Sequence, residues 1–106
     1  MTYNVHMISI GAVKFDWDED KNAANQRKHG ISFEEALTVF FSTPLLVFHD
    51  PDHSEDEVRY VVFGFSASTR VLAVVHCESE SGKIVRIISA RKATRAEQKK
   101  FFGGTK

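Results

Sequence analysis

The chain has 106 residues, of which 42% are hydrophobic and 26% charged. This length predicts a single domain, and the composition is that of a folded globular protein rather than a disordered one. No apolar run reaches the roughly 18 residues of a membrane-spanning helix, and the first residues lack the pattern of a signal peptide. The single cysteine, Cys77, rules out a disulfide framework, so we expect a cytoplasmic protein.

The net charge is zero, but the two halves of the chain differ in sign. Residues 1–57 carry 4 Lys and Arg against 11 Asp and Glu, whereas residues 58–106 carry 10 against 3. Such an asymmetry favours an anionic partner for the second half. The alternative is that the fold mixes the two halves, so that their charges pair with one another in space.

The chain is interpreted as an N-terminal extension (1–13), one domain (14–102) and a flexible tail (103–106). Within the domain, Phe15–Trp17 predicts a short strand. Asp18–His29 predicts a helix, because acidic residues fill its first turn, basic residues fill its last, and Gly30 follows. The interior of this helix is polar apart from Ala23 and Ala24, which predicts that it packs along one thin stripe.

A second helix is marked by a capping box. Ser32 and Glu35 have the S-x-x-E spacing in which each side chain bonds the backbone N–H of the other residue. One apolar face follows at helical spacing, formed by Phe33, Ala36, Leu37 and Phe40. Pro44 is expected to end this helix.

Four β-rich runs come next: Leu45–His49, Arg59–Phe65, Val71–Cys77 and Ile84–Arg91. The short connections between the last three predict an antiparallel meander. Thr94 and Glu97 form a second capping box, which opens a helix through about Phe102. The sequence therefore predicts an α+β domain. Its antiparallel sheet has about four strands plus a short N-terminal strand, with two N-terminal helices and a C-terminal helix on one face.

The basic half offers side chains that suit RNA cleavage without a metal. That reaction needs a base for the 2′-OH, a cation for the phosphorane and an acid for the leaving 5′-oxygen. The candidates on the predicted strands are His76, Arg59, Arg86 and Arg91. Arg86 is favoured, because a cation between apolar residues in mid-strand is unusual.

Strand alternation limits which of these candidates share a face. Arg86 and Arg91 do so only if a bulge intervenes or Arg91 lies beyond the strand, and His76 joins Arg86 only in some hairpin registers. The structural alternative for each arginine is a surface ion pair, and for His76 a half-buried position in a strand.

Other kinds of site are weakly supported. The run from His49 to His53 (HDPDH) contains four side chains that bind metals, yet Pro51 and the polarity of the loop favour a turn. Cys77 cannot pair with His76 as nucleophile and base, since adjacent strand residues point to opposite faces. No phosphate-binding glycine motif and no metal-ligand spacing occurs, so we expect no cofactor.

Several segments together resemble the BrnT family, the toxins of BrnT–BrnA type II toxin–antitoxin pairs. The matching stretches are Phe15–Asp18 (FDWD), Asn25–Phe33 (NQRKHGISF), Glu34–Phe40 (EEALTVF), Asp50–Ser54 (DPDHS), Glu57–Tyr60 (EVRY) and Val85–Arg95 (VRIISARKATR). The first dozen residues are extra relative to the family. The resemblance implies a RelE-like fold and a ribonuclease that arrests translation. It also implies a BrnA-like ribbon–helix–helix antitoxin, which would supply the DNA contacts of a complex that represses its own promoter.

The resemblance also implies which residues form the site. Those that match the basic positions of the family are Arg59, Arg86, Arg91, Lys92 and Arg95, while His76 lies in a strand where relatives often carry histidine. We hypothesise that Arg86 and Arg91 hold the scissile phosphate, that Arg59 orients the backbone, and that His76 is the general acid or base. Lys92 and Arg95 are interpreted as RNA- or antitoxin-binding residues. The rival hypothesis is a non-catalytic module that binds nucleic acid or protein, because phosphate affinity needs only charge.

Overall fold

The computed structural model describes residues 5–50, 58–79 and 82–103. Within them the elements are β1 (Val5–Ile10), β2 (Val13–Asp18), α1 (Glu19–His29), α2 (Phe33–Val39), β3 (Leu46–Asp50), β4 (Arg59–Phe65), β5 (Val71–Ser79), β6 (Ile84–Lys92) and α3 (Arg95–Gly103). The predicted α+β class is confirmed, and the predicted helices and strands all occur. Their ends are shifted by at most about two residues, except that α2 ends at Val39, with Phe40 as its cap, and not just before Pro44 as predicted.

The ends of α1 follow the signals in the sequence. The Asp18 carboxylate accepts hydrogen bonds from the backbone N–H groups of Asp20 and Lys21, and Gly30 ends the helix with a φ of 70°. The helix packs along one thin stripe, as predicted, but Ala23 and Ala24 are exposed and do not form it. The residues that α1 buries are polar, and they pack because their side chains find hydrogen-bond partners in the core.

Those buried residues are Asn22 and Asn25. The Asn25 amide donates to the carbonyl oxygens of Ile31 and Ala90, at 2.8 Å each, and accepts from the N–H of Ala90 at 3.2 Å. Asn22 accepts from the N–H of Phe33 at 2.8 Å. The two amides therefore fasten α1 to the start of α2 and to β6.

Only half of the first predicted capping box is present. The Ser32 hydroxyl accepts from the N–H of Glu35 at 3.0 Å, as expected. The Glu35 carboxylate instead accepts two hydrogen bonds from Arg70 and one from Ser66. The hydrogen bonds from Arg70 are charge-assisted and therefore stronger than a bond from the backbone N–H of Ser32. The Glu35 carboxylate therefore binds Arg70 and does not complete the capping box.

The strands form one mixed sheet in the order β1-β2-β6-β5-β4-β3. The predicted antiparallel meander from β3 to β6 is confirmed, but β2 pairs with β6 in parallel, so the expectation of a wholly antiparallel sheet is wrong. The connection between β2 and β3 explains the parallel pairing. The helices α1 and α2 carry the chain from β2 across to β3, and the meander then returns beside β2 in the same direction. Residues 5–10 of the predicted extension add β1 to β2 as an antiparallel outer strand.

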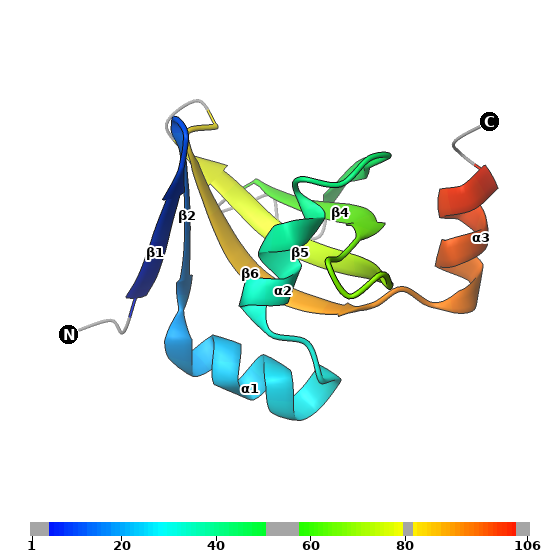
Figure 1. Ribbon diagram of the computed structural model, residues 1–106, viewed down its shortest axis with the longest axis horizontal. Helices are drawn as coiled ribbons and strands as arrows, with labels where there is room; N and C mark the ends of the chain where they lie inside the picture. Colours follow the sequence, from blue (N-terminus) through cyan, green and yellow to red (C-terminus); the bar gives the residue numbers. More distant parts are fainter. Residues whose placement is uncertain (1–4, 51–57, 80–81, 104–106) are drawn as a thin grey trace.

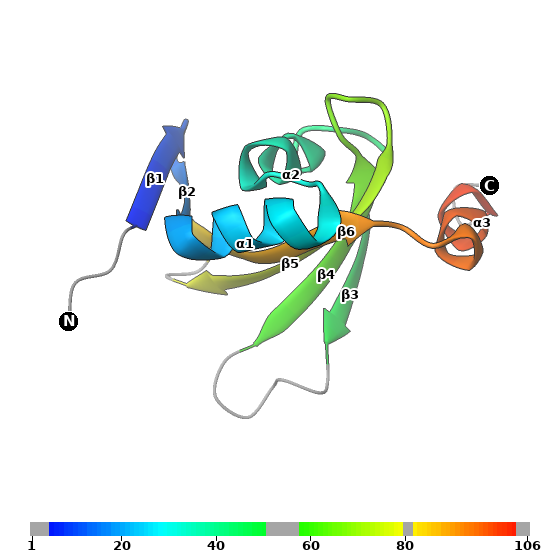
Figure 2. The ribbon, with the colours of Figure 1, turned by 90° about the horizontal axis from the view of Figure 1, so that it is seen from below.

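The helices do not all lie on one face of the sheet, which corrects that prediction. Figure 2 shows α1 and α2 on one side, whereas α3 lies beyond the end of β6. We call the side under α1 and α2 the covered face (Figure 1). It holds the main core of Phe15, Trp17, Ile31, Phe33, Ala36, Leu37, Val39, Val62, Leu72, Val74, Val85, Ile87 and Ala90. A smaller core, through which α3 packs on the other face, contains Phe63, Val71, Ala73, Ala93 and Phe101.

Candidate nucleic-acid interface on the uncovered face

A β-bulge brings arginines of β6 to the same face of the sheet. Val75 of β5 pairs with Ser89, but the next residue, His76, pairs with Ile87, so β6 contains one extra residue at this point. Arg86 and Arg91 have opposite parity, and without this residue their side chains would leave the sheet on opposite sides. The bulge that would let Arg86 and Arg91 share a face is therefore present.

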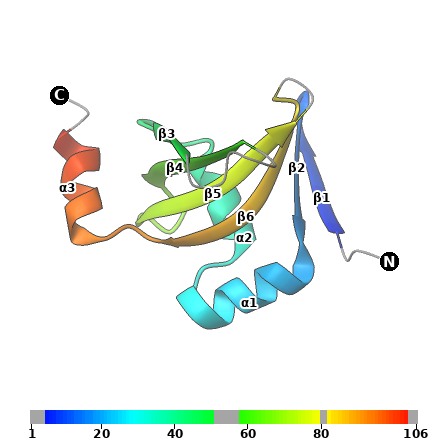
Figure 3. The same cartoon turned by 180° about the vertical axis from the view of Figure 1, so that it is seen from behind.

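Four polar side chains form a row across neighbouring strands. Arg59 of β4 pairs with Cys77 of β5, Cys77 pairs with Arg86 of β6, and Arg86 pairs with Asp16 of β2. All four lie opposite the covered face, since their neighbours along each strand belong to the main core or to the ring contacts on that side. With Arg91 they form what we call the arginine face, on the side seen in Figure 3.

Asp16 orients Arg86 within this row. Its Oδ2 accepts a hydrogen bond from Arg86 Nη2 at 3.2 Å, with the carboxylate 7% exposed and the guanidinium 42% exposed. The Oδ1 atom is buried and has no hydrogen-bond partner among the described residues. Sequence reasoning did not select Asp16, although an acidic residue between two core aromatics in a strand is a signal that could have been used.

Arg91 is held by α3. Its guanidinium donates two hydrogen bonds to the Glu97 carboxylate, at 2.7 and 3.0 Å. Glu97 and Thr94 also form the complete capping box that was predicted, with Thr94 N–H to Glu97 at 2.8 Å and Glu97 N–H to the Thr94 hydroxyl at 3.1 Å. The bonds from Arg91 lower the pKa of Glu97 to about 2, so this carboxylate is charged at neutral pH.

The spacing of the arginines suits a chain of phosphates. Along β5, the partner of Arg91 (Ala73) lies four residues from the partner of Arg86 (Cys77), which is about 13 Å of strand. Arg59 and Arg86 are separated by one intervening strand, or about 9–10 Å. This spacing lets Arg59 and Arg86 contact one anionic group and Arg91 a second group further along the sheet.

His76 lies on the covered face, away from these arginines. Its ring is 1% exposed, stacks on Tyr60 with centroids 5.4 Å apart and meets Phe40 edge-on at 5.0 Å. Nε2–H donates to the Glu78 carboxylate at 3.0 Å, while Nδ1 has no partner among the described residues. Burial lowers the pKa of His76, and Glu78 only partly opposes the shift. The observed register thus separates His76 from Arg86.

The pairing of β3, β4 and β5 places further titratable residues beside His76. His49 pairs with Tyr60, and Tyr60 pairs with His76, so three rings form a row across the strands. The His49 and Tyr60 rings meet with centroids 5.9 Å apart. Neither Tyr60 nor Glu78 was selected from the sequence, because the row depends on a register that the sequence does not fix.

The remaining basic candidates lie near α3. Lys92 and Arg95 are both exposed, Lys92 at the end of β6 and Arg95 at the start of α3.

Part of the basic half pairs with the acidic half, as one interpretation of the charge pattern expected. Arg70 binds Glu35 at 2.6 Å and Arg86 binds Asp16 at 3.2 Å.

The metal-ligand run at His49–His53 lies partly outside the described residues, since positions 51–53 are not among them. Among the described residues, no group of three or more His, Cys, Asp or Glu side chains is placed to hold a metal ion. None of the helices in the described parts of the chain is long and apolar enough to cross a membrane.

Comparisons with known proteins agree with this fold and identify a family. The family described as the ribonuclease toxin, BrnT, of type II toxin–antitoxin systems matches residues 17–97, more than half of the chain. The 1.1 Å crystal structure of the Brucella abortus ribonuclease toxin, BrnT, is similar, with a TM-score of 0.55 and 25% sequence identity. This similarity covers 74% of the present chain and 94% of the Brucella chain. Among curated proteins, none matches the sequence significantly.

Proposed function

The chain belongs to the BrnT family of type II ribonuclease toxins, and from this premise we propose that it is an endoribonuclease that cleaves RNA without a metal and thereby inhibits translation. The observation that supports the proposal most strongly is the shared face of Arg59, Arg86 and Arg91, which the bulge in β6 creates. Guanidinium groups match phosphate geometry and keep their charge at every physiological pH.

The proposed chemistry is a transfer within the RNA strand. The 2′-oxygen gives its proton to a general base and forms a bond to the adjacent phosphorus. The bond from phosphorus to the 5′-oxygen breaks as that oxygen takes a proton from a general acid. The products are a 2′,3′-cyclic phosphate and a 5′-hydroxyl end. Arg59 and Arg86 stabilise the charge that develops on the phosphorane. Arg91 holds the backbone further along, in exchange for part of its bonding to Glu97.

The predicted acid–base role of His76 needs a separate test, because its ring is buried on the covered face. The variant His76→Phe keeps a flat ring between Tyr60 and Phe40 but removes both nitrogens. A folded variant that still cleaves RNA would exclude the role, and a folded variant that does not would support it.

The proposed partner is a BrnA-like antitoxin with a ribbon–helix–helix DNA-binding fold. A type II system contains a protein antitoxin, which supports the existence of such a partner. The antitoxin would cover the RNA-binding surface and supply the DNA contacts by which the complex represses its promoter. Co-purification of the chain with the product of a short neighbouring reading frame tests this part of the proposal.

The experiment that tests the function is RNA cleavage by the purified full chain in excess EDTA. Arg59→Ala, Arg86→Ala and Arg91→Ala are compared with Arg27→Ala, which removes an exposed arginine on α1. We expect wild-type activity in the control and a loss of roughly 10²–10³ in rate for Arg86→Ala. RNA that is bound but never shortened by folded wild-type protein, with or without ribosomes, would favour the non-catalytic binding module instead.

A further inference from the structure

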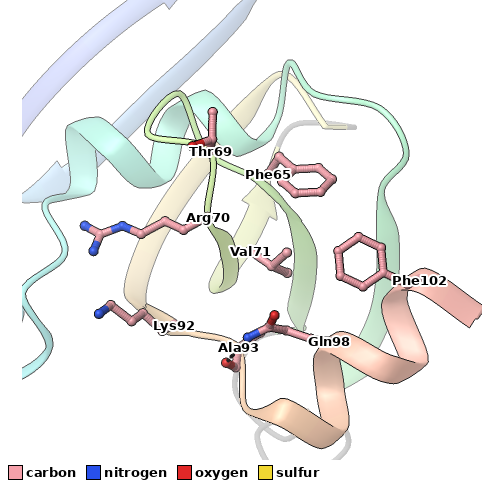
Figure 4. A pocket seen from close by; sticks show the side chains of 8 residues that line it. All are labelled: Phe65, Thr69, Arg70, Val71, Lys92, Ala93, Gln98 and Phe102. Carbon is pink, nitrogen blue, oxygen red and sulfur yellow. Dashed lines mark hydrogen bonds between the residues drawn. The ribbon is translucent and has the colours of Figure 1, made fainter.

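A pocket of about 380 Å³ lies at the end of the sheet, where the turn between β4 and β5, the end of β6 and α3 meet (Figure 4). This volume lies within the range of sites that bind small ligands. Lys92 at its edge is about 20 Å along β6 from Arg86. A group bound in the pocket therefore cannot be the phosphate that Arg86 contacts.

One end of the pocket is cationic. Figure 4 shows the side chains of Arg70 and Lys92 extending toward the same side. Arg70 is fixed by Glu35, with Nε to Oε2 at 2.8 Å and Nη2 to Oε1 at 2.6 Å, so its charge is largely balanced. Lys92 is exposed and makes no ion pair with another described residue. This end therefore carries a net positive charge suited to an anion.

The other end is aromatic. The rings of Phe65 and Phe102 lie with centroids 5.8 Å apart, and Phe102 is 50% exposed although it belongs to the helix that closes the smaller core. Between the two ends, the Gln98 amide donates to the carbonyl of Ala93 at 3.2 Å, which fixes its orientation. The pocket thus combines two aromatic rings tilted at 55° to each other, an amide and a cation.

Several hydrogen bonds hold the turn that forms one wall of the pocket. Thr69 has a φ of 60°, a conformation that β-branched residues rarely adopt and that proteins retain mostly at functional sites. It is held there because Thr69 N–H donates to the Ser66 carbonyl and Ser66 N–H to the Arg70 carbonyl, both at 2.9 Å. The Ala67 N–H also donates to the Thr38 hydroxyl at 2.8 Å, which ties the turn to the end of α2.

We propose that this pocket binds one nucleotide of the RNA substrate, with the base against Phe65 and Phe102 and a phosphate at Lys92. The inference rests on the proposed ribonuclease function and extends it to specificity. A nucleotide held here sets which phosphodiester reaches Arg59 and Arg86, so the pocket selects the position of the cut. Base stacking on an aromatic ring and a phosphate near a lysine are the two contacts that single-stranded RNA recognition combines.

The test titrates the full chain with each of the four nucleoside 5′-monophosphates and with inorganic phosphate, followed by calorimetry and by amide chemical shifts. We expect at least one nucleotide to bind and to shift the amides of the 66–70 turn and of residues 92 and 98. Lys92→Ala and Phe102→Ala should each weaken that binding about tenfold. The control Lys99→Ala, an exposed cation of α3 outside the pocket, should bind like wild type.

Two results would overturn the inference. One is the absence of any nucleotide-dependent shift in the pocket. The other is nucleotide binding that is unchanged in both pocket variants. The Arg86→Ala protein keeps the tests distinct, because it should lose cleavage and still bind the nucleotide. Wild-type cleavage positions in Lys92→Ala would refute the specificity role and leave the ribonuclease proposal intact.

Discussion

The two faces of the sheet use the same strands for different purposes. On the covered face, alternate residues of β2, β4, β5 and β6 are apolar and almost completely buried beneath α1 and α2. On the arginine face, the residues between them include Arg86 and Arg91, whose side chains are each 42% exposed. The one extra residue of the bulge in β6 places Arg86 and Arg91 on the same face. Substitutions on the covered face should therefore change stability, and those on the arginine face should change RNA binding and cleavage.

The largest expected effect is on the covered face. Trp17 is 0% exposed and meets Phe33 edge-on with ring centroids 6.1 Å apart. Trp17→Ala should lower the free energy of unfolding by about 3–5 kcal/mol, because it leaves a cavity under α2. Urea denaturation measures the change. Phe41→Ala, at a ring that is 55% exposed, is the control and should change stability far less. Equal stability of Trp17→Ala and wild type would contradict the assignment of the core.

A smaller effect is expected on the arginine face, at Asp16. Asp16→Asn keeps the shape of the side chain but removes the charge that orients Arg86. We expect a roughly tenfold lower kcat for RNA cleavage. Stability should fall by only about 1 kcal/mol, since Arg86 is 42% exposed and water screens the pair. Asp20→Asn, at an exposed carboxylate of α1, is the matched control. Unchanged kcat and KM in Asp16→Asn would remove Asp16 from the site.

The smallest effects are changes of stability with pH. The covered face and the arginine face should lose stability in different pH ranges. Burial between Tyr60 and Phe40 lowers the pKa of His76 from 6.5. The unfolded chain therefore binds this proton more readily than the folded chain, and stability should decrease as the pH falls below about 6.5. His76→Phe should remove this slope in chemical denaturation followed against pH. A slope that persists in the variant would show that another group causes it.

The ion pair between Arg91 and Glu97, on the arginine face, should lose its stabilising effect at lower pH. Arg91 lowers the pKa of Glu97 from 4.5 to about 2, so the pair stabilises the fold above pH 4.5 and loses its contribution as the pH falls toward 2. Glu97→Gln should abolish this second decrease and leave the one due to His76 in place. Because Glu97 and Arg91 are partly exposed, the contribution is expected to be small.

The sequence was most informative where the physics is local. Asp18 and Gly30 marked the ends of α1, and Thr94 with Glu97 marked the start of α3, because each cap involves residues within one helical turn. The strands of the meander were likewise visible from their β-rich runs and short connections. Local patterns did not show the parallel pairing of β2 with β6, which joins segments some seventy residues apart.

The candidate site was predicted less completely than the fold. The arginines could be chosen from their unusual mid-strand positions, but their shared face depends on a bulge that the residue types do not reveal. The same uncertainty of register allowed His76 beside Arg86, and the structure places it on the other face. The ion pair between Glu35 and Arg70 could not be predicted from local patterns either, because Arg70 lies in a turn that comes close to Glu35 only in the folded chain.

The central claim, that RNA lies across the arginine face, is tested most directly through the single cysteine. Cys77 is half-buried and occupies the strand between Arg59 and Arg86. The measurement is the rate of Cys77 alkylation with and without an RNA whose 2′-hydroxyls are methylated, so that it binds but is not cleaved. We expect slower alkylation in the presence of this RNA for wild type and Arg27→Ala, and a weaker effect for Arg86→Ala. An RNA that is bound, as shown by fluorescence anisotropy, but leaves the alkylation rate of Cys77 unchanged would contradict this claim.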